Sequence, residues 1–327
     1  MNYLRKYKRI VYVPNLYGVF QFLLLEDRPI KDTLIFHDRF KDEFSSQFCS
    51  FDERNKNNYL CYLLIKYLSL RSRNTVVYLS GEMCYTNYFL KCFRNVVYLE
   101  DGVASYEKVN DESRQTVQRR KSIIKRLILG DIYPWFGIAS QVKKIYLTGI
   151  FPVPEIIRDK VELINLRQLW MNKTLKRQDE IRRLFIPDGF SMDEMKGRDI
   201  LLLTQPFSEY SGGSFSESDK IEVYRRLISN YDESRLIIKR HPSEKTCYSS
   251  YFPGVYILTV YCPFELLLFM GCKVRTVISV NSTAIFGLDN SIEKIITGYD
   301  VTPELIKEAK RLNIYDGISN KFRTAKN

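Results

Sequence analysis

The sequence contains very little histidine: only His37 and His241 occur among its 327 residues. Paired cysteine motifs are missing as well, because the seven cysteines form no CxxC pair and their number is odd. Several of them lie in apolar runs such as "NYLCYLLIKYL". These features argue against zinc ligation and a disulfide framework, and they predict reduced core thiols in a cytosolic protein.

Long hydrophobic runs are also absent. No apolar segment approaches the ~20 residues that a membrane-spanning helix needs. The "IVYV" run near the N-terminus is too short for the hydrophobic region of a signal peptide, so we expect none. The sequence has no GxGxxG fingerprint, Walker A loop or GxSxG elbow, which argues against the sites that these motifs build.

Positive charge is in excess, with a formal net charge of +12 and a pI near 9.2. This balance favours an anionic partner, such as a nucleic acid, an anionic lipid or a phosphorylated substrate. Hydrophobic residues make up 45% of the chain and charged residues 27%, which are globular proportions. Charge alone does not choose among the three partners.

Strand-like and helix-like segments alternate along the chain, which predicts parallel sheets with helices on both faces. A polar segment with two glycines, residues 186–200, interrupts the alternation. We therefore predict two α/β domains, residues 1–190 and 191–327. The predicted strands are 9–15, 32–38, 75–80, 95–102, 143–150, 200–206, 235–242, 254–260 and 276–282, and the predicted helices are 16–27, 57–73, 86–93, 219–231 and 263–271.

Two adjacent carboxylates follow one predicted strand, in "VVYLEDG". Ligands of open parallel sheets bind at the carboxyl ends of the strands. Glu100 and Asp101 could supply a general base there, because burial and like charge raise a carboxyl pKa, and Gly102 allows a sharp turn. An ordinary Asp-Gly turn is the alternative interpretation.

His241 ends another predicted strand, in "LIIKRHPSE". Lys239 and Arg240 precede it, and Pro242 stops the strand. A phosphate at this position would favour the imidazolium, which can donate a proton to it. The alternative is a surface histidine in a basic turn. We interpret His37, the other histidine, as structural.

A third polar group follows the strand in "TVISVNSTAIFGL". Asn281, Ser282 and Thr283 precede a predicted helix, whose N-terminus would attract an anion. A plain helix cap is the alternative. Glu265 begins the preceding predicted helix and could bind ribose hydroxyls or only complement the helix dipole.

Taken in order, Glu100-Asp101-Gly102, His241-Pro242 and Ser282-Thr283 resemble the shared motifs of bacterial sialyltransferases, and most closely glycosyltransferase family 52. The resemblance covers roughly residues 9–290 and extends to three segments between the motifs. These segments are "SIIKRLILGD" (122–131), "ILLLTQPFSE" (200–209) and "PFELLL" (263–268).

This resemblance implies a GT-B fold, with two Rossmann-like domains facing a central cleft. The N-terminal domain would be on the acceptor side, and the C-terminal domain would bind the nucleotide sugar. The implied reaction is an inverting transfer of sialic acid from CMP-sialic acid to a terminal galactose of a capsule or lipooligosaccharide, with α-2,3 linkage, without metal or cofactor. The alternatives are transfer from another nucleotide sugar, such as glucosyl transfer, and a non-catalytic nucleic-acid-binding protein.

The resemblance also implies residue roles. His241 would be the general acid, Glu265 would hold the ribose, and Ser282 and Thr283 would hold the phosphate. By analogy with related sialyltransferase families, the base is Asp101 or Glu100. Family 52 instead uses an aspartate in the loop after the first strand of its second domain. That aspartate is not matched here, and the nearest carboxylate in this loop is Glu209. Further substrate-binding candidates are Gly102, Gln205, Lys239, Pro242 and Asn281.

The basic amphipathic stretch 117–129 is a candidate contact with anionic lipid, although a helix with one solvated basic face is an equal alternative. We expect a bacterial cytoplasmic protein, peripheral at the inner face of the membrane. A homodimer is a further expectation. Nucleic acid is not expected as a partner, because the sequence has no RNP-like motif or DNA-reading helix pattern.

Overall fold

The computed structural model describes residues 7–28, 30–37, 40, 49–52, 58–71 and 75–312. The chain divides into two compact units, Met1–Phe185 and Ile186–Asn327. The sequence predicts a boundary between residues 190 and 191, whereas the second unit begins at Ile186, the first residue of the polar 186–200 segment. Each unit is described below by itself.

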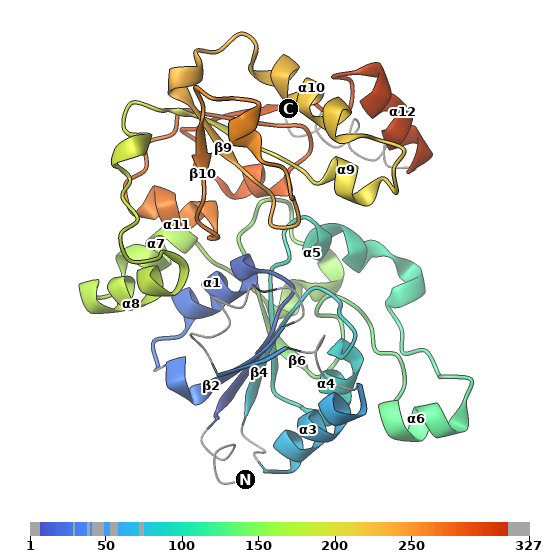
Figure 1. The fold of residues 1–327 in the computed structure, drawn as a ribbon. Helices are drawn as coiled ribbons and strands as arrows, with labels where there is room; N and C mark the ends of the chain where they lie inside the picture. Colours follow the sequence, from blue (N-terminus) through green and yellow to red (C-terminus); the bar gives the residue numbers. More distant parts are fainter. Residues whose placement is uncertain are drawn as a thin grey trace. The chain divides into compact units, whose positions relative to one another are not determined.

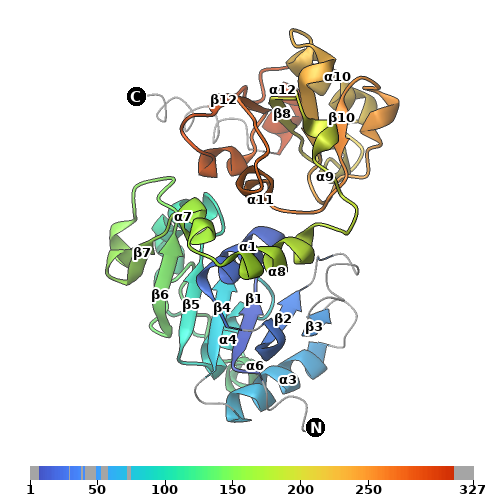
Figure 2. The same cartoon turned by 90° about the vertical axis from the view of Figure 1, so that its left-hand side faces the viewer.

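A seven-stranded parallel sheet forms the centre of the first unit, in the order β3-β2-β1-β4-β5-β6-β7 (Figure 2). The chain order reverses between β1 and β4, so the topological switch point of this sheet lies there. The strands are β1 Arg9–Tyr12, β2 Thr33–His37, β3 Cys49–Asp52, β4 Val76–Ser80, β5 Val96–Leu99, β6 Val142–Leu147 and β7 Val161–Leu163.

Helices cover both faces of this sheet because successive strand residues point to opposite sides. Tyr12 packs on Phe89 of α4 with ring centroids 5.1 Å apart, whereas Tyr78 contacts Phe22 of α1 at 4.9 Å. Figure 1 shows α1 on one side of the sheet and α3 and α4 on the other. The helices are α1 Leu16–Leu25, α3 Asn58–Arg71, α4 Thr86–Cys92, α5 Ala104–Glu107, α6 Ile123–Leu129, α7 Leu166–Met171 and α8 Leu175–Phe185.

The second unit contains a five-stranded parallel sheet in the order β10-β9-β8-β11-β12. Its switch point lies between β8 and β11. The strands are β8 Ile200–Leu203, β9 Leu236–Lys239, β10 Tyr256–Leu258, β11 Thr276–Ser279 and β12 Glu293–Ile296. The helices are α9 Phe207–Tyr210, α10 Glu217–Ile228, α11 Phe264–Phe269 and α12 Pro303–Arg311.

Each predicted strand and helix has a counterpart, although the observed elements are shorter. Three strands were not predicted: β3, β7 and β12. Each lies at an edge of its sheet. An edge strand is covered less than a central one, so its sequence need not be a continuous apolar run, as "VEL" in β7 and "EKII" in β12 illustrate.

Two helix predictions need correction. The stretch 117–129 is helical only from Ile123, because Gln118 instead pairs with Ile132 in an antiparallel bridge. The helix expected after Ser282 is a five-residue 3-10 helix, Thr283–Gly287. Its few aligned peptides give it little dipole, so the anion argument from a helix N-terminus does not hold at this position.

His37 and the cysteines are placed as follows. His37 is buried and stacks on Phe40 with centroids 5.0 Å apart, in keeping with a structural role. No disulfide joins the six cysteines whose side chains the structure describes, which are Cys61, Cys84, Cys92, Cys247, Cys262 and Cys272. Cys61 and Cys262 are buried, but Cys84 and Cys247 are exposed, so the prediction of core thiols is wrong for these last two.

Candidate active site

Polar groups converge at the carboxyl edge of the first sheet, next to its switch point. Asn15 follows β1, and its side-chain amide donates to Asp101 Oδ1 at 3.2 Å. Asp101 follows β5, and its backbone N–H donates to Ser105 Oγ at 2.7 Å. Gly102 has φ +53°, a left-handed conformation that glycine adopts without strain. The Asp-Gly turn therefore holds a half-buried carboxylate at the edge where ligands of such sheets bind.

Glu100 has a different environment although it is adjacent to Asp101. Its carboxylate is buried and accepts hydrogen bonds from Tyr106 Oη at 2.7 Å, from Thr148 N at 2.6 Å and from Thr148 Oγ1 at 2.8 Å. Burial raises the pKa of Glu100, while these hydrogen bonds act in the opposite direction. Glu100 thus links β5 to the segment after β6, and its oxygens are occupied by protein donors.

Gly81 brings the end of β4 against Asp101. It has φ +62°, and a Cβ built on it would lie 2.7 Å from Asp101 Oδ2 and 3.2 Å from Pro14 Cγ. A side chain cannot occupy that space without moving the carboxylate. The close approach of backbone to Asp101 is therefore a second reason for glycine at this position, beside its positive φ.

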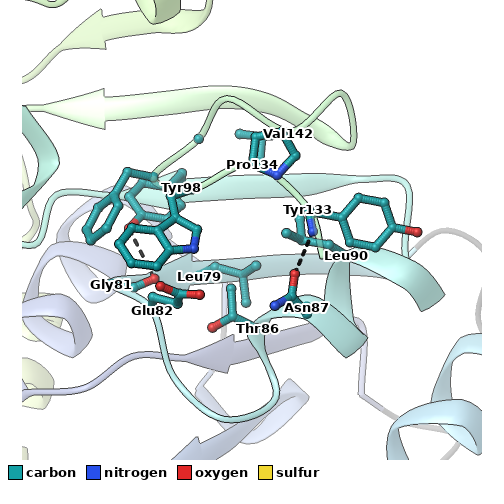
Figure 3. Close-up of a pocket in the computed structure, with 13 residues that line it drawn as sticks. Leu79, Gly81, Glu82, Thr86, Asn87, Leu90, Tyr98, Tyr133, Pro134 and Val142 are labelled. Carbon is teal, nitrogen blue, oxygen red and sulfur yellow. Dashed lines mark hydrogen bonds between the residues drawn. The ribbon is translucent and has the colours of Figure 1, made fainter. Parts of the chain in front are cut away.

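A small pocket opens beside Gly81 in the first unit (Figure 3). It is lined by the end of β4, by α4 and by residues 133–137. Tyr98 Oη donates to Gly81 O at 3.1 Å, and Tyr133 N donates to Asn87 Oδ1 at 2.8 Å, as Figure 3 shows. Glu82 is in the lining, which puts a further carboxylate at this edge that sequence reasoning missed.

In the second unit, His241 follows β9 and is half-buried. Its Nδ1 accepts a hydrogen bond from Ser243 N at 3.2 Å. The neutral imidazole therefore carries its proton on Nε2. Burial, and next the positive charge of Lys239, lower the pKa of His241 from 6.5 to about 4, while Glu209 acts in the opposite direction. The ligand-free imidazole is thus uncharged at neutral pH and offers an N–H donor rather than a mobile proton.

Behind His241, three carboxylates surround a fully buried lysine, and that of Glu217 lies 3.1 Å from Lys220 Nζ. Lys220 Nζ lies 2.8 Å from Glu209 Oε2 and 3.8 Å from Glu244 Oε1. Burial alone would raise the pKa of Glu209, but hydrogen bonds from Lys220 and from the backbone of Lys245 outweigh it and lower this pKa. Glu209 is therefore ionised at neutral pH and already paired.

The ends of β11 and α11 supply the remaining polar groups. Asn281 donates to Tyr299 Oη at 2.7 Å, and its buried Oδ1 has no hydrogen-bond partner within the described part of the chain. Ser282 is buried, and its N–H donates to Ser279 Oγ at 2.9 Å. Glu265 is buried in the first turn of α11, and a Cβ on Gly287 would lie 3.8 Å from its Oε1. Glu265 and the segment after Ser282 are therefore neighbours.

Other predicted binding residues lie around the same edge. Gln205 follows β8, and its backbone N–H donates to Tyr224 Oη at 2.6 Å. Lys239 is the half-buried last residue of β9, and Pro242 is exposed. The side chain of Thr283 lies outside the described residues. In the described ranges, no group of three or more His, Cys, Asp or Glu side chains could hold a metal ion.

Comparison with known proteins identifies the family. A sequence profile of glycosyltransferase family 52 matches residues 19–305. A Haemophilus influenzae protein described as uncharacterized is 34% identical over 249 residues, which are 76% of this chain and 76% of that protein. The chain belongs to glycosyltransferase family 52. The resemblance seen in the sequence is thereby confirmed, and the protein is a glycosyltransferase.

Solved structures similar to this family 52 protein include two bacterial sialyltransferases. The α/β-galactoside α-2,3-sialyltransferase of Photobacterium phosphoreum has a TM-score of 0.57 and 12% identity, covering 94% of this chain and 95% of that chain. The GT-B domain of the Photobacterium damselae sialyltransferase has a TM-score of 0.57 and 11% identity, covering 94% and 97%. At such identities the likeness concerns the fold, and the GT-B prediction is confirmed.

Sequence reasoning found the strand-end residues of the family 52 protein but missed their supports. Glu244 follows His241 by three residues, a spacing at which a carboxylate can reach back to a backbone N–H. That signal was present in "HPSE". Lys220 and Tyr248 gave no comparable signal, because only the folded chain brings α10 and the segment after His241 together.

Proposed function

We propose that this family 52 glycosyltransferase transfers sialic acid from CMP-sialic acid to a terminal galactose of a bacterial surface glycan, with inversion and without a metal ion. The observation that carries the proposal is the environment of His241, a neutral imidazole whose proton is on Nε2 at the carboxyl edge of a nucleotide-binding type of sheet. The family and the fold of the similar sialyltransferases support it.

In the proposed reaction, the acceptor hydroxyl attacks the anomeric carbon of sialic acid while the bond from that carbon to the CMP phosphate oxygen breaks. Negative charge develops on the departing phosphate. His241 Nε2–H donates to that oxygen, and Lys239 adds positive charge nearby. A fixed donor and a cation directed at a developing anion stabilise the transition state. The phosphate of CMP departs as an anion that keeps this hydrogen bond from His241, while the proton of the acceptor hydroxyl passes to the base.

The base takes the proton of the acceptor hydroxyl, and Asp101 is our first candidate. Its carboxylate is half-buried at the strand edge and accepts from Asn15, whereas Glu100 is fully buried and accepts from Tyr106 and Thr148. Glu209 is ionised at neutral pH, but it is engaged by the buried Lys220. Loss of that partner would be needed before Glu209 could accept a substrate proton freely.

The nucleotide would be held by the groups at the ends of β11 and α11. Glu265 is proposed to bind the ribose hydroxyls, and Ser282 with Thr283 the phosphate. Asn281 lies beside them after β11, with its side-chain amide donating to Tyr299 Oη. Gln205 and Pro242 lie at the carboxyl edge of the same sheet, after β8 and β9.

The test is incubation of the purified protein with CMP-sialic acid and a lactoside, measuring CMP release and the sialylated product. Release that depends on both substrates is expected. If no galactoside acceptor supports it, the donor assignment is wrong, and UDP-glucose with the same acceptors then tests glucosyl transfer. Dialysis against EDTA is expected to leave the rate unchanged, and a loss restored by Mg²⁺ would contradict the metal-independent mechanism.

We further propose contact with anionic lipid through α6. Ile123, Ile124, Leu127 and Ile128 are 56 to 72% exposed and lie along one side of this helix. Exposed basic residues precede and interrupt them, at Arg119, Lys121 and Lys125. Figure 1 shows α6 within a long excursion from the first unit. Apolar side chains beside lysine and arginine fit the interface of an anionic bilayer, whereas two such basic surfaces would repel each other.

Sedimentation with vesicles tests this contact. The chain is expected to bind vesicles containing phosphatidylglycerol, and a double variant, Ile124→Ser with Leu127→Ser, is expected to lose most of that binding. Leu163→Ser is the control, because Leu163 is 60% exposed on β7 of the same unit. If the double variant binds vesicles normally and instead shifts a dimer to a monomer in gel filtration, the surface joins two copies of the chain. Among the described residues no helix is both long and apolar enough to span a bilayer.

A further inference from the structure

The turn that carries His241 is closed by Glu244. His241 N donates to Glu244 Oε2 at 2.7 Å, and Glu244 N donates to His241 O at 3.0 Å. Ser243 N, between them, donates to His241 Nδ1 at 3.2 Å. One carboxylate and two backbone N–H groups therefore fix both the backbone of His241 and the orientation of its ring.

Glu244 is itself held by groups from three other parts of the second unit. Thr204, directly after β8, donates through its hydroxyl to Oε2, and Tyr248 Oη donates to Oε1 at 2.6 Å. Lys220 of α10 lies 3.8 Å from Oε1. The Glu244 and Lys220 side chains are both fully buried, so neither is screened by water. A carboxylate with this many donors has little freedom to move.

Lys220 connects this turn to a second anchor. Its Nζ binds Glu209 Oε1 at 3.0 Å and Oε2 at 2.8 Å, and Glu209 Oε1 accepts from Lys245 N at 2.9 Å. The backbone is thus tied at His241 through Glu244 and at Lys245 through Glu209. One buried ammonium lies between the two carboxylates that make these ties.

We propose that Glu244, with the buried Lys220 as its counter-charge, is a positioning residue that fixes the imidazole of His241 for catalysis. This inference rests on the proposed function for its kinetic consequence, but not for its structural one. Complete burial of charged groups has a large desolvation free energy, and a protein with apolar residues in their place is often more stable. Orientation of His241 is a function for which this loss of stability is tolerated, because displacement of a reacting group by about 1 Å can lower turnover about 100-fold.

Imidazole NMR of the full-length protein tests the inference without any substrate. The chain has only two histidines, so His241→Asn assigns the ring signals of His241. Wild type is expected to show the single Nε2–H tautomer and a pKa of about 4. Glu244→Gln is expected to show both tautomers and a pKa displaced toward the ordinary 6.5, since the loosened ring becomes better hydrated. Unchanged ring signals in Glu244→Gln would overturn the proposal.

Kinetics provide the second readout. Glu244→Gln is expected to lower kcat about 10- to 100-fold with little change in KM for the donor. Glu222→Gln is the control, because Glu222 lies on α10 but pairs with Arg225 and Arg226 at the surface. A wild-type kcat in Glu244→Gln would refute the role. If wild type itself does not use CMP-sialic acid, the proposed function fails while the NMR result still decides the positioning role.

A milder variant covers the case in which Glu244→Gln does not fold. Tyr248→Phe removes one donor to Glu244 and keeps the ring that stacks on Phe252 with centroids 6.3 Å apart. Its ring signals and kcat are expected to change in the same direction by a smaller amount. If Tyr248→Phe folds and leaves both unchanged, Glu244 does not act through this network.

Discussion

Replacement of Gly81 by alanine is a direct test of Asp101. The added Cβ would lie 2.7 Å from Asp101 Oδ2, whereas an ordinary contact begins near 3.4 Å, so the carboxylate has to move by about 0.7 Å. It cannot move freely, because Asn15 binds its other oxygen. If Asp101 is the base, a displacement of this size is expected to lower kcat by about 10- to 100-fold.

Stability changes have to be separated from this effect. Alanine at φ +62° costs about 1–2 kcal/mol in the left-handed region, and the close contact adds about 1–3 kcal/mol. Gly197→Ala is the matched control, because Gly197 has φ +81° and nothing within 4 Å of its built Cβ. Gly197→Ala therefore loses stability only through the left-handed backbone conformation, without a close contact.

The assay is urea unfolding together with CMP release at saturating donor. Gly81→Ala is expected to be less stable than Gly197→Ala and to lose turnover, while Gly197→Ala keeps nearly wild-type turnover. The reasoning is refuted if Gly81→Ala, folded at the assay temperature, has a kcat within about twofold of the control. In that case Glu209 becomes the first candidate for the base.

Three further predictions concern the second unit. His241→Asn is expected to lower kcat by about 10²- to 10⁴-fold in the CMP-release assay, and near-normal turnover would exclude His241 as the acid. Because folding lowers the pKa of His241 from 6.5 to about 4, the unfolded chain binds more protons between these values, so the free energy of unfolding should rise with pH across that window. Urea titrations should show a smaller rise in His241→Asn, and equal slopes would contradict the shift. Glu209→Gln removes the nearest carboxylate of the buried Lys220 but leaves Glu217 at 3.1 Å, so we expect a cost of about 1–3 kcal/mol. Stability equal to that of Glu222→Gln would contradict this prediction.

Much of the fold could be predicted because buried parallel strands are nearly continuous apolar runs. Segments such as "VVYLS" and "ILLL" are unambiguous for this reason, and they correspond to β4 and β8. The short edge strand β7 carries exposed side chains and has no such signature. The 3-10 helix after Ser282 was mistaken for an α-helix because local pattern does not report which hydrogen bonds close a turn.

The candidate site divides in the same way. The sequence by itself determined which chemistry stands at the strand ends, since His241, Asp101 and Ser282 each follow an apolar run in the linear order. Only the tertiary structure decided their surroundings. It occupies the oxygens of Glu100, pairs Glu209 with a buried lysine, and lowers the pKa of His241 through burial and Lys239. These properties depend on groups that are distant in sequence and adjacent in space, and no local pattern encodes that adjacency.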